Sequence, residues 1–347
     1  MSNNKTQQKM GLGYLMELAT GHYKSKVLFV ATNLGIFDLL SKGPKTLQNI
    51  AKEVNIQTRP ATMLLNACVA LNLLEKEDIV YSNSRTADLY LVDGKPQYIK
   101  PAFFKFDEHS YLLFDKLEEA ILKDAPQISP ENPDDPELSP SCMLIGNKED
   151  YANFISALDP IAIWPARAIA GTFDFSQFKR LIDVGGGSGV YSIAIVEKNP
   201  NIEAIVFDLP HVCEIAQNNI AKKKLSERIK CHPGDYFKHT LPEGFDVALL
   251  SNVLHGYGPD MCELLLQKIY DSLPSGGAII VSDTVLDDNG YGPETAVLMS
   301  LYYLLITEQG RNYTVSEYEY MLKNAGFIEI KPYKTSAATT YIAGRKR

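Results

Sequence analysis

The sequence predicts an α/β protein with a mainly helical N-terminal domain and a C-terminal domain built on a parallel sheet. Three observations indicate this fold class. Amphipathic helical patterns fill most of the first 100 residues, and short apolar runs alternate with helical patterns after residue 180. A glycine-rich turn follows the first of those runs. A chain of 347 residues is also long enough to fold as two domains.

Composition excludes several other classes of protein. Hydrophobic residues make up 45% of the chain and charged residues 22%, as in ordinary globular proteins. No apolar run is long enough to cross a membrane, and the polar N-terminus lacks the apolar core of a secretory signal. The five cysteines are scattered and form no CxxC pair, which favours a reduced compartment over disulfides or a zinc site. We expect a cytoplasmic protein with no metal ion and no membrane partner.

The net charge of −8 is unevenly distributed along the chain. Residues 1–100 carry 12 Lys and Arg against 8 Asp and Glu, and the remaining residues carry 22 against 34. An acidic protein is poorly suited to bind nucleic acid, so we expect no such partner. The basic balance of the first part keeps a DNA-binding regulator as an alternative.

The first 100 residues have the element order of a winged-helix domain. Helical patterns cover residues 11–42, 46–54 and 59–74, and two β-like stretches follow at 79–82 and 89–92. Winged helices either read DNA or pack as dimers. Arg59 is the only Lys or Arg in the third helical pattern. We therefore predict a dimerisation domain over residues 1–100.

The next segment, residues 101–172, is predicted to be a helical linker that contains a loop. Five prolines between residues 126 and 140 remove backbone donors and indicate a surface loop at 126–140. Residues 173–347 are predicted to form a Rossmann-like domain, because short apolar strands separated by helices are typical of a parallel α/β sheet. Its strand-like runs lie at 181–184, 204–207, 229–232, 246–250 and 278–282.

The strongest functional signal is the glycine-rich turn after the first strand. Asp183 ends the strand, and Gly185, Gly186, Gly187 and Gly189 follow. Glycine lets the backbone turn sharply and approach a ligand closely. Position 190 is a valine, so the dinucleotide fingerprint G-x-G-x-x-G is not matched. Asp183 also suits an ammonium group better than a pyrophosphate. The alternative is a tight turn without a ligand.

Carboxylates follow the next two strands. Asp208 lies 21 residues beyond Gly187, where it can accept hydrogen bonds from ribose hydroxyls or cap the following helix. After the third strand come Gly234, Asp235 and Tyr236. Asp235 can accept from an exocyclic amine, and Tyr236 can pack on a purine. NAD and S-adenosylmethionine (SAM) both carry such an adenosine.

His255 lies at the end of the fourth strand, after Ser251 and Asn252. Ligands of open α/β sheets bind at the carboxyl ends of the strands, so we expect His255 at the ligand site. A histidine titrates near neutral pH and suits the role of general base.

Together these motifs resemble one family. The order DVGGGSG, VFDLP, GDYF, NVLHGY, LPSGGAIIVSD and LKNAGF is similar to that of the dimeric small-molecule O-methyltransferases. This family includes acetylserotonin O-methyltransferase, plant phenolic O-methyltransferases and bacterial natural-product methyltransferases. The resemblance covers nearly the whole chain, because the first 100 residues look like the family's winged-helix dimerisation domain. It implies a homodimer that uses SAM.

The resemblance also implies roles for the cofactor residues. Gly185 and Gly187 would face the methionine part of SAM, Asp208 the ribose, and Asp235 with Tyr236 the adenine. The full predicted cofactor site is Asp183, Gly185, Gly187, Asp208, Leu209, Gly234, Asp235, Tyr236, Ser251 and Asn252.

The catalytic residues implied by the family are His255, as the base that removes the acceptor's proton, and Asp283, as its acidic neighbour. Two further family positions differ in this chain. Gly256 stands where the family favours Asp after the histidine, and Asn312 stands where it has Glu in a Gly-x-Glu-Arg-Thr stretch. Glu308 is the candidate to replace the missing acid. Fewer acids weaken the base, so a more acidic phenol, an enol or an amine would need less help.

The predicted acceptor pocket lies between the sheet domain and the helices before it. Aromatic and methionine side chains suit a flat apolar acceptor. The candidate residues are Phe106, Tyr111, Trp164, Met299, Tyr302, Tyr303 and Asn312.

We predict a SAM-dependent O-methyltransferase that acts on a hydroxyl group of a small aromatic or polyketide-like molecule. A C- or N-methyltransferase of the same fold is one alternative, and a SAM-binding enzyme that does not methylate is another. A winged-helix regulator and a nicotinamide dehydrogenase are the remaining hypotheses.

Overall fold

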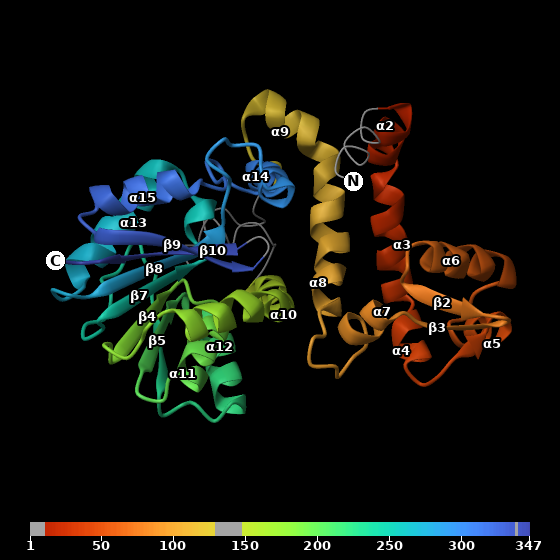
Figure 1. Ribbon diagram of the computed structural model, residues 1–347, viewed down its shortest axis with the longest axis horizontal. Helices are drawn as coiled ribbons and strands as arrows, with labels where there is room; N and C mark the ends of the chain where they lie inside the picture. The colour runs from red at the N-terminus through yellow and green to blue at the C-terminus, as the bar shows by residue number, and fades with distance from the viewer. Residues whose placement is uncertain (1–10, 129–147, 337–338) are drawn as a thin grey trace, which may run out of the picture. The chain divides into compact units, whose positions relative to one another are not determined.

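The computed structural model describes residues 11–128, 148–336 and 339–347. The chain forms two compact units, residues 1–109 and 110–347 (Figure 1). The first unit extends past the expected end at residue 100, and the predicted segment 101–172 is divided between the two units. Most of the predicted loop at 126–140 lies outside the described residues.

The first unit is a helical domain with a small antiparallel sheet. Its helices are α2 (Leu12–Ala19), α3 (Gly21–Asn33), α4 (Ile36–Leu40), α5 (Leu47–Glu53), α6 (Thr58–Ala70), α7 (Arg85–Tyr90) and α8 (Lys100–Lys105). Its strands are β1 (Lys45–Thr46), β2 (Leu74–Glu77) and β3 (Val80–Asn83), in the order β1-β3-β2. A buried cluster that includes Phe37, Leu65 and Tyr81 joins these elements. The predicted winged-helix arrangement is confirmed.

Two elements of this unit differ from the prediction. Residues 89–92 do not form a strand, because Ser84 caps α7 by accepting a hydrogen bond from the Ala87 amide at 3.3 Å. The third predicted helix ends earlier than residue 74, since Asn72 adopts a left-handed backbone with φ 57°. Strand β2 begins two residues later and pairs with β3.

The second unit is built on a seven-stranded sheet with the order β6-β5-β4-β7-β8-β10-β9. Its parallel strands correspond to the five predicted runs and are β4 (Arg180–Val184), β5 (Glu203–Asp208), β6 (Ile229–Pro233), β7 (Val247–Ser251) and β8 (Ala278–Thr284). Two antiparallel strands, β9 (Ile328–Ser336) and β10 (Thr339–Arg345), are additions to the prediction.

Helices cover both faces of this sheet (Figure 1). The helical elements of the second unit are η2 (Phe114–Lys116), α9 (Leu117–Lys123), α10 (Lys148–Thr172), α11 (Val190–Lys198), α12 (Pro210–Lys222), η4 (Leu254–Gly256), α13 (Pro259–Ser272), α14 (Glu294–Ile306) and α15 (Val315–Asn324). Element η1 (Phe106–Tyr111) spans the boundary between the two units. Alternate residues of β4 point to opposite faces, so Leu181 packs with α10, α11 and α12, whereas Ile182 packs with α13 and α15. Across the described residues, no helix has both the length and the apolar character that spanning a membrane requires.

Candidate active site

The carboxyl ends of the five parallel strands lie at one edge of the sheet, which is where open α/β sheets bind ligands. At this edge β4 leads into a glycine loop (residues 185–189), and β5 ends at Asp208. Strand β6 leads to Asp235, β7 leads to His255, and β8 contains Asp283. Residues distant in sequence are therefore brought to one edge.

His255 and Asp283 form a close pair. Nδ1 of His255 lies 2.6 Å from Oδ1 of Asp283, and the two side chains are 15% and 1% exposed. A carboxylate that accepts the Nδ1 proton fixes the imidazole tautomer and leaves Nε2 as a proton acceptor. This arrangement gives His255 the tautomer that a general base needs.

Asp283 is held through both of its oxygens. Oδ1 also accepts from the Thr284 amide at 2.9 Å, and Oδ2 accepts from the Tyr318 hydroxyl at 3.1 Å. Tyr318 belongs to α15 and is fully buried. The orientation of the carboxylate is thus fixed by groups from β8 and α15.

Tyr303 of α14 packs against the imidazole ring of His255. The two ring centroids lie 4.3 Å apart with an angle of 17° between the planes. Burial raises the pKa of the Tyr303 hydroxyl well above its ordinary value, so the phenol stays neutral. Stacking of this kind restricts rotation of the imidazole.

Close packing explains the glycines that follow β4. Gly185, Gly187 and Gly189 have φ angles of 69°, 57° and 80°, in the left-handed region that favours glycine. A Cβ atom on Gly185 would lie only 2.8 Å from Val253 Cγ2 and 3.5 Å from a ring carbon of Tyr236. A side chain at Gly185 would therefore disturb the loop and the residues around it.

Two acidic side chains contact the glycine loop from the strand ends. Asp208 accepts from the amides of Gly187 at 2.8 Å and Leu209 at 2.7 Å, and each oxygen keeps acceptor capacity for a ribose hydroxyl. Asp183 accepts from the Ser192 hydroxyl through Oδ2 at 2.7 Å. Its Oδ1 is buried and has no partner within the described ranges. Such an oxygen fits a ligand that donates a proton, as an ammonium group does.

A third carboxylate at the loop, Asp159 of α10, lies outside every motif found in the sequence. It accepts a hydrogen bond from the Ser188 hydroxyl. Ile155, one helical turn earlier, lies 3.6 Å from the position of a Cβ on Gly187. One face of α10 therefore packs against the glycine loop. Only the fold indicates this contact, because Asp159 is an isolated acid in a long helix.

Burial raises the pKa of all three carboxyl groups at the glycine loop. The values are about 6 for Asp159, about 7 for Asp183 and about 6 for Asp208. In the part of the chain that the structure describes, no basic side chain contributes to lowering any of these values. A bound cation would supply the missing positive charge. The residues at this loop thus fit SAM, which carries a sulfonium and an ammonium group.

Asp235 and Tyr236 lie after β6. Asp235 accepts from the Phe237 amide at 2.8 Å, and its second oxygen lies 3.3 Å from Lys238 Nζ. The hydroxyl groups of Tyr236 and Tyr257 are 2.7 Å apart. The Tyr236 ring is thereby fixed beside Gly185, next to the glycine loop.

The remaining predicted cofactor residues lie at strand ends. A Cβ atom on Gly234 would come within 2.5 Å of the Phe207 ring, so only glycine fits there. Ser251 is the buried last residue of β7. Asn252 is exposed, has a φ angle of 54°, and donates to the Tyr191 hydroxyl at 3.4 Å.

Asn312 is fully buried beside α14. Its Nδ2 donates to the Ala296 carbonyl at 2.7 Å, and its backbone amide donates to the Ser300 hydroxyl at 3.2 Å. A carboxylate in the same place has no proton to give that carbonyl, which accounts for an amide here. Oδ1 has no partner among the residues described. Glu308 is exposed, so it does not replace the acid that the family has at position 312.

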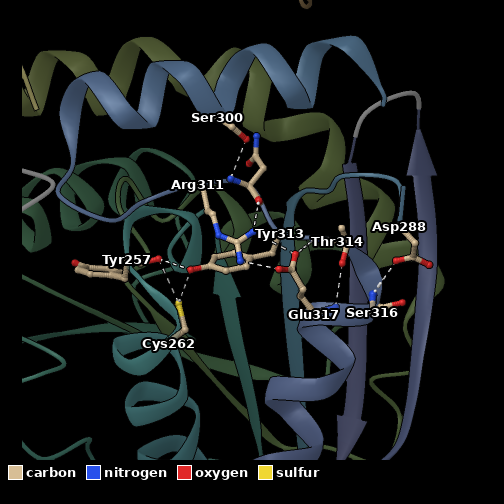
Figure 2. Close-up of polar contacts among 10 residues, drawn as sticks. Tyr257, Cys262, Asp288, Ser300, Arg311, Tyr313, Thr314, Ser316 and Glu317 are labelled. Atoms are coloured by element: carbon tan, nitrogen blue, oxygen red, sulfur yellow. Dashed lines mark hydrogen bonds and ion pairs between the residues drawn. The ribbon is translucent and has the colours of Figure 1, made fainter. Parts of the chain in front are cut away.

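Polar contacts hold the segment between α14 and α15 in place, as Figure 2 shows. Arg311 and Glu317 form an ion pair at 2.6 Å, and the Tyr313 hydroxyl donates to the Tyr257 carbonyl at 2.5 Å. Thr314 and Glu317 form a capping box that begins α15. These contacts fix the direction in which α15 leaves the segment.

The predicted acceptor residues are divided between the two units. Met299 and Tyr302 pack in the apolar cluster that contains Tyr303, the tyrosine that stacks on the histidine. Tyr111 is partly buried in the second unit, and Trp164 is 42% exposed on α10. Phe106 belongs to the first unit.

Comparison with known proteins gives two family matches. A model of the O-methyltransferase domain matches residues 144–328, and a model of the O-methyltransferase dimerisation domain matches residues 16–93. Among similar proteins, 3-hydroxy-5-methyl-1-naphthoate 3-O-methyltransferase of Streptomyces sahachiroi is 35% identical, over 96% of this chain and 94% of that protein. Acetylserotonin O-methyltransferase of Bos taurus is 33% identical, over 98% of this chain and 99% of that protein.

A similar solved structure is that of human N-acetylserotonin methyltransferase in complex with SAM. It has a TM-score of 0.88 and 30% identity, and the match covers 97% of this chain and 98% of that one. The fold and the site thus define a SAM-dependent methyltransferase with a dimerisation domain. Within that class, the chain belongs to the O-methyltransferase family.

Proposed function

We propose that the protein methylates a hydroxyl group of a small aromatic or polyketide-like acceptor, with His255 as the general base. The observation that carries this proposal is the 2.6 Å contact between His255 Nδ1 and Asp283 Oδ1. It leaves Nε2 as the proton acceptor at the edge of the sheet where ligands bind.

The chemistry divides between the cofactor and the protein. When bound, SAM supplies a methyl group activated by its sulfonium. His255 would take the proton of the acceptor hydroxyl at Nε2 as the oxygen is methylated, and S-adenosylhomocysteine would be the product. Asp283 stabilises the imidazolium that results. Holding the acceptor close to the methyl group supplies much of the rate.

For SAM itself, we assign the methionine part to Gly185 and Gly187, the ribose to Asp208, and the adenine to Asp235 and Tyr236. Support for this assignment comes from the order of these residues along the edge of the sheet. The raised pKa values of the carboxyls around the glycine loop also favour a cationic ligand.

The acceptor is proposed to be a flat aromatic compound with an acidic hydroxyl. The names of the relatives, a naphthoate and an acetylserotonin O-methyltransferase, support a bicyclic aromatic. Residues 256 and 312, which are acidic in the family, are Gly and Asn in this chain. Asp283 is therefore the carboxylate that contacts His255. With fewer acids to raise the basicity of His255, a hydroxyl that gives up its proton readily is the better substrate.

We further propose that two copies of the chain form a homodimer through the first unit. Helix α2 has no buried residue, and its Leu12, Leu15 and Leu18 are 77%, 62% and 58% exposed. An exposed apolar face of this kind is typical of an interaction surface. The second half of α2, residues 16–19, lies in the segment that matches the dimerisation domain.

The role of His255 is tested with His255→Ala, using SAM with 3-hydroxy-1-naphthoate and with N-acetylserotonin as probes. We expect kcat to fall about 10²- to 10⁴-fold, as for loss of a general base, with SAM affinity unchanged by calorimetry. The exposed His22 of the first unit, changed to Ala, is the matched control. Full activity of His255→Ala would overturn the proposal, and a methyl group found on nitrogen or carbon of the product would favour the alternative reactions.

A further inference from the structure

We infer that Tyr318 is a positioning residue that acts through Asp283 to set the orientation and the basicity of His255. The inference rests on the proposed function of His255 as the base. The Tyr318 hydroxyl donates to Oδ2 of Asp283 at 3.1 Å, and Nδ1 of His255 lies 2.6 Å from Oδ1 of the same carboxylate. The three side chains form one hydrogen-bonded chain that links α15 to η4, the short helix that follows β7.

The other titratable groups around Asp283 carry no charge that would compete with its hydrogen bonds to His255 and Tyr318. The other titratable groups that face Asp283 are Tyr191 on α11, Cys262 on α13 and Tyr303 on α14. Burial raises the pKa of each, so all three are neutral at neutral pH. Among the described residues, Tyr318 supplies the only side-chain hydroxyl that is bonded to the carboxylate.

The hydrogen bond from Tyr318 has two physical effects. It holds Oδ2, so the Asp283 carboxyl group cannot rotate away from the imidazole. It also stabilises the negative charge of the carboxylate, which weakens the pull of that charge on the Nδ1 proton of His255. Without the hydroxyl, the imidazolium form of His255 would be favoured, and Nε2 would be occupied by a proton at a higher pH.

The structure offers a matched control in Tyr313. Its ring packs edge-on against that of Tyr318, with centroids 5.5 Å apart, and both side chains are fully buried. The Tyr313 hydroxyl donates to the Tyr257 carbonyl and has no bond to Asp283. Tyr313→Phe thus removes an equally buried hydroxyl from the same cluster without changing the contacts of the carboxylate.

The experiment is an NMR titration of the full-length protein with ¹⁵N-labelled histidine, in the absence of any acceptor. The His255 signals are assigned by their loss in His255→Gln. In Tyr318→Phe we expect the midpoint of the His255 titration to move upward by about half a pH unit, as for loss of a hydrogen bond to a carboxylate. Tyr313→Phe should leave the midpoint unchanged. An unchanged midpoint in Tyr318→Phe, or an equal shift in both variants, overturns the inference.

A second replacement covers the case in which Tyr318→Phe does not fold. Site-specific 3-fluorotyrosine in place of Tyr318 keeps the ring and the hydroxyl but makes the phenol a stronger donor, so the midpoint should move downward. In an Asp283→Asn background, neither replacement should shift it. A midpoint that responds equally with and without the Asp283 carboxylate contradicts an action through that residue.

The titration and the methylation assay test separate claims, so either claim can be wrong while the other holds. If His255→Ala keeps full methyl transfer, the proposed base is wrong, yet the titration still reports whether Tyr318 acts on His255. If the base is right, Tyr318→Phe should lower kcat several-fold below the shifted midpoint and leave the KM for SAM unchanged. A purely structural role of Tyr318 would instead reduce stability without moving the titration.

Discussion

The charged form of the Asp159 carboxyl group destabilises the folded protein, because the side chain is buried. Burial raises its pKa from the ordinary value of 3.8 to about 6, so the folded chain binds a proton more tightly than the unfolded chain does. The stability that this proton contributes is therefore fully present below about pH 4 and is lost as the pH rises through about 6. Asp159 thus makes the protein without SAM less stable at neutral than at acidic pH.

The substitution Asp159→Asn keeps an acceptor for the Ser188 hydroxyl and removes the charge. We expect the free energy of unfolding to fall less between pH 4.5 and pH 7.5 than in the wild type, by up to about 2 kcal/mol. Urea unfolding at the two pH values, without SAM, measures the difference. Asp174→Asn, at an exposed acid after the same helix, is the control. Equal pH dependence in the wild type and Asp159→Asn would contradict the burial effect.

The sequence predicts some residues of this site better than others. Gly185, Asp208 and His255 lie in short motifs that directly follow apolar strands, so their neighbourhood follows from the parallel sheet. Asp159 and Tyr318 lie inside helices, where sequence spacing indicates only which residues share a face. Their hydrogen bonds to the loop and to the carboxylate depend on how α10 and α15 pack, and no local pattern records that packing.

Whole helices and strands are likewise hard to predict when no local apolar pattern marks them. The strands β4 to β8 are predicted because they are short apolar runs between helices. Strand β9 is harder to recognise, since it forms one edge of the sheet and residues 329 and 331–334 along it are exposed. The strand predicted at 89–92 is wrong because residues 89 and 90 end α7, a helix whose first turn depends on the Ser84 cap rather than on an apolar pattern.

At the level of elements, we predict that the capping box of α15 stabilises the second unit. Thr314→Ala removes the oxygen that accepts the Glu317 amide and should cost about 1 kcal/mol of unfolding free energy. The measurement is the shift of the urea midpoint. Ser316→Ala, at an exposed position in the same helical turn, should change the midpoint by much less. A similar shift for both variants would mean that the box does not contribute.

At the level of the whole molecule, the exposed apolar face of α2 should control assembly. Leu15→Glu places a charge in that face and should convert a dimer into a monomer, since burying an unpaired charge is costly. Analytical ultracentrifugation of the full-length protein measures the mass. Leu264→Glu, at a leucine that is 56% exposed on α13 of the second unit, should remain dimeric. A dimer that survives Leu15→Glu would place the interface elsewhere.

The three carboxylates around the glycine loop also bear on turnover. Methyl transfer converts a sulfonium into a neutral thioether, so S-adenosylhomocysteine carries one positive charge fewer than SAM. In the proposed binding mode, the product keeps the ammonium group but has lost the sulfonium, so the buried acids would have less positive charge beside them. On this proposal, Asp159, Asp183 and Asp208 would favour exchange of spent cofactor for fresh SAM, and the preference would grow as the pH rises and these acids ionise.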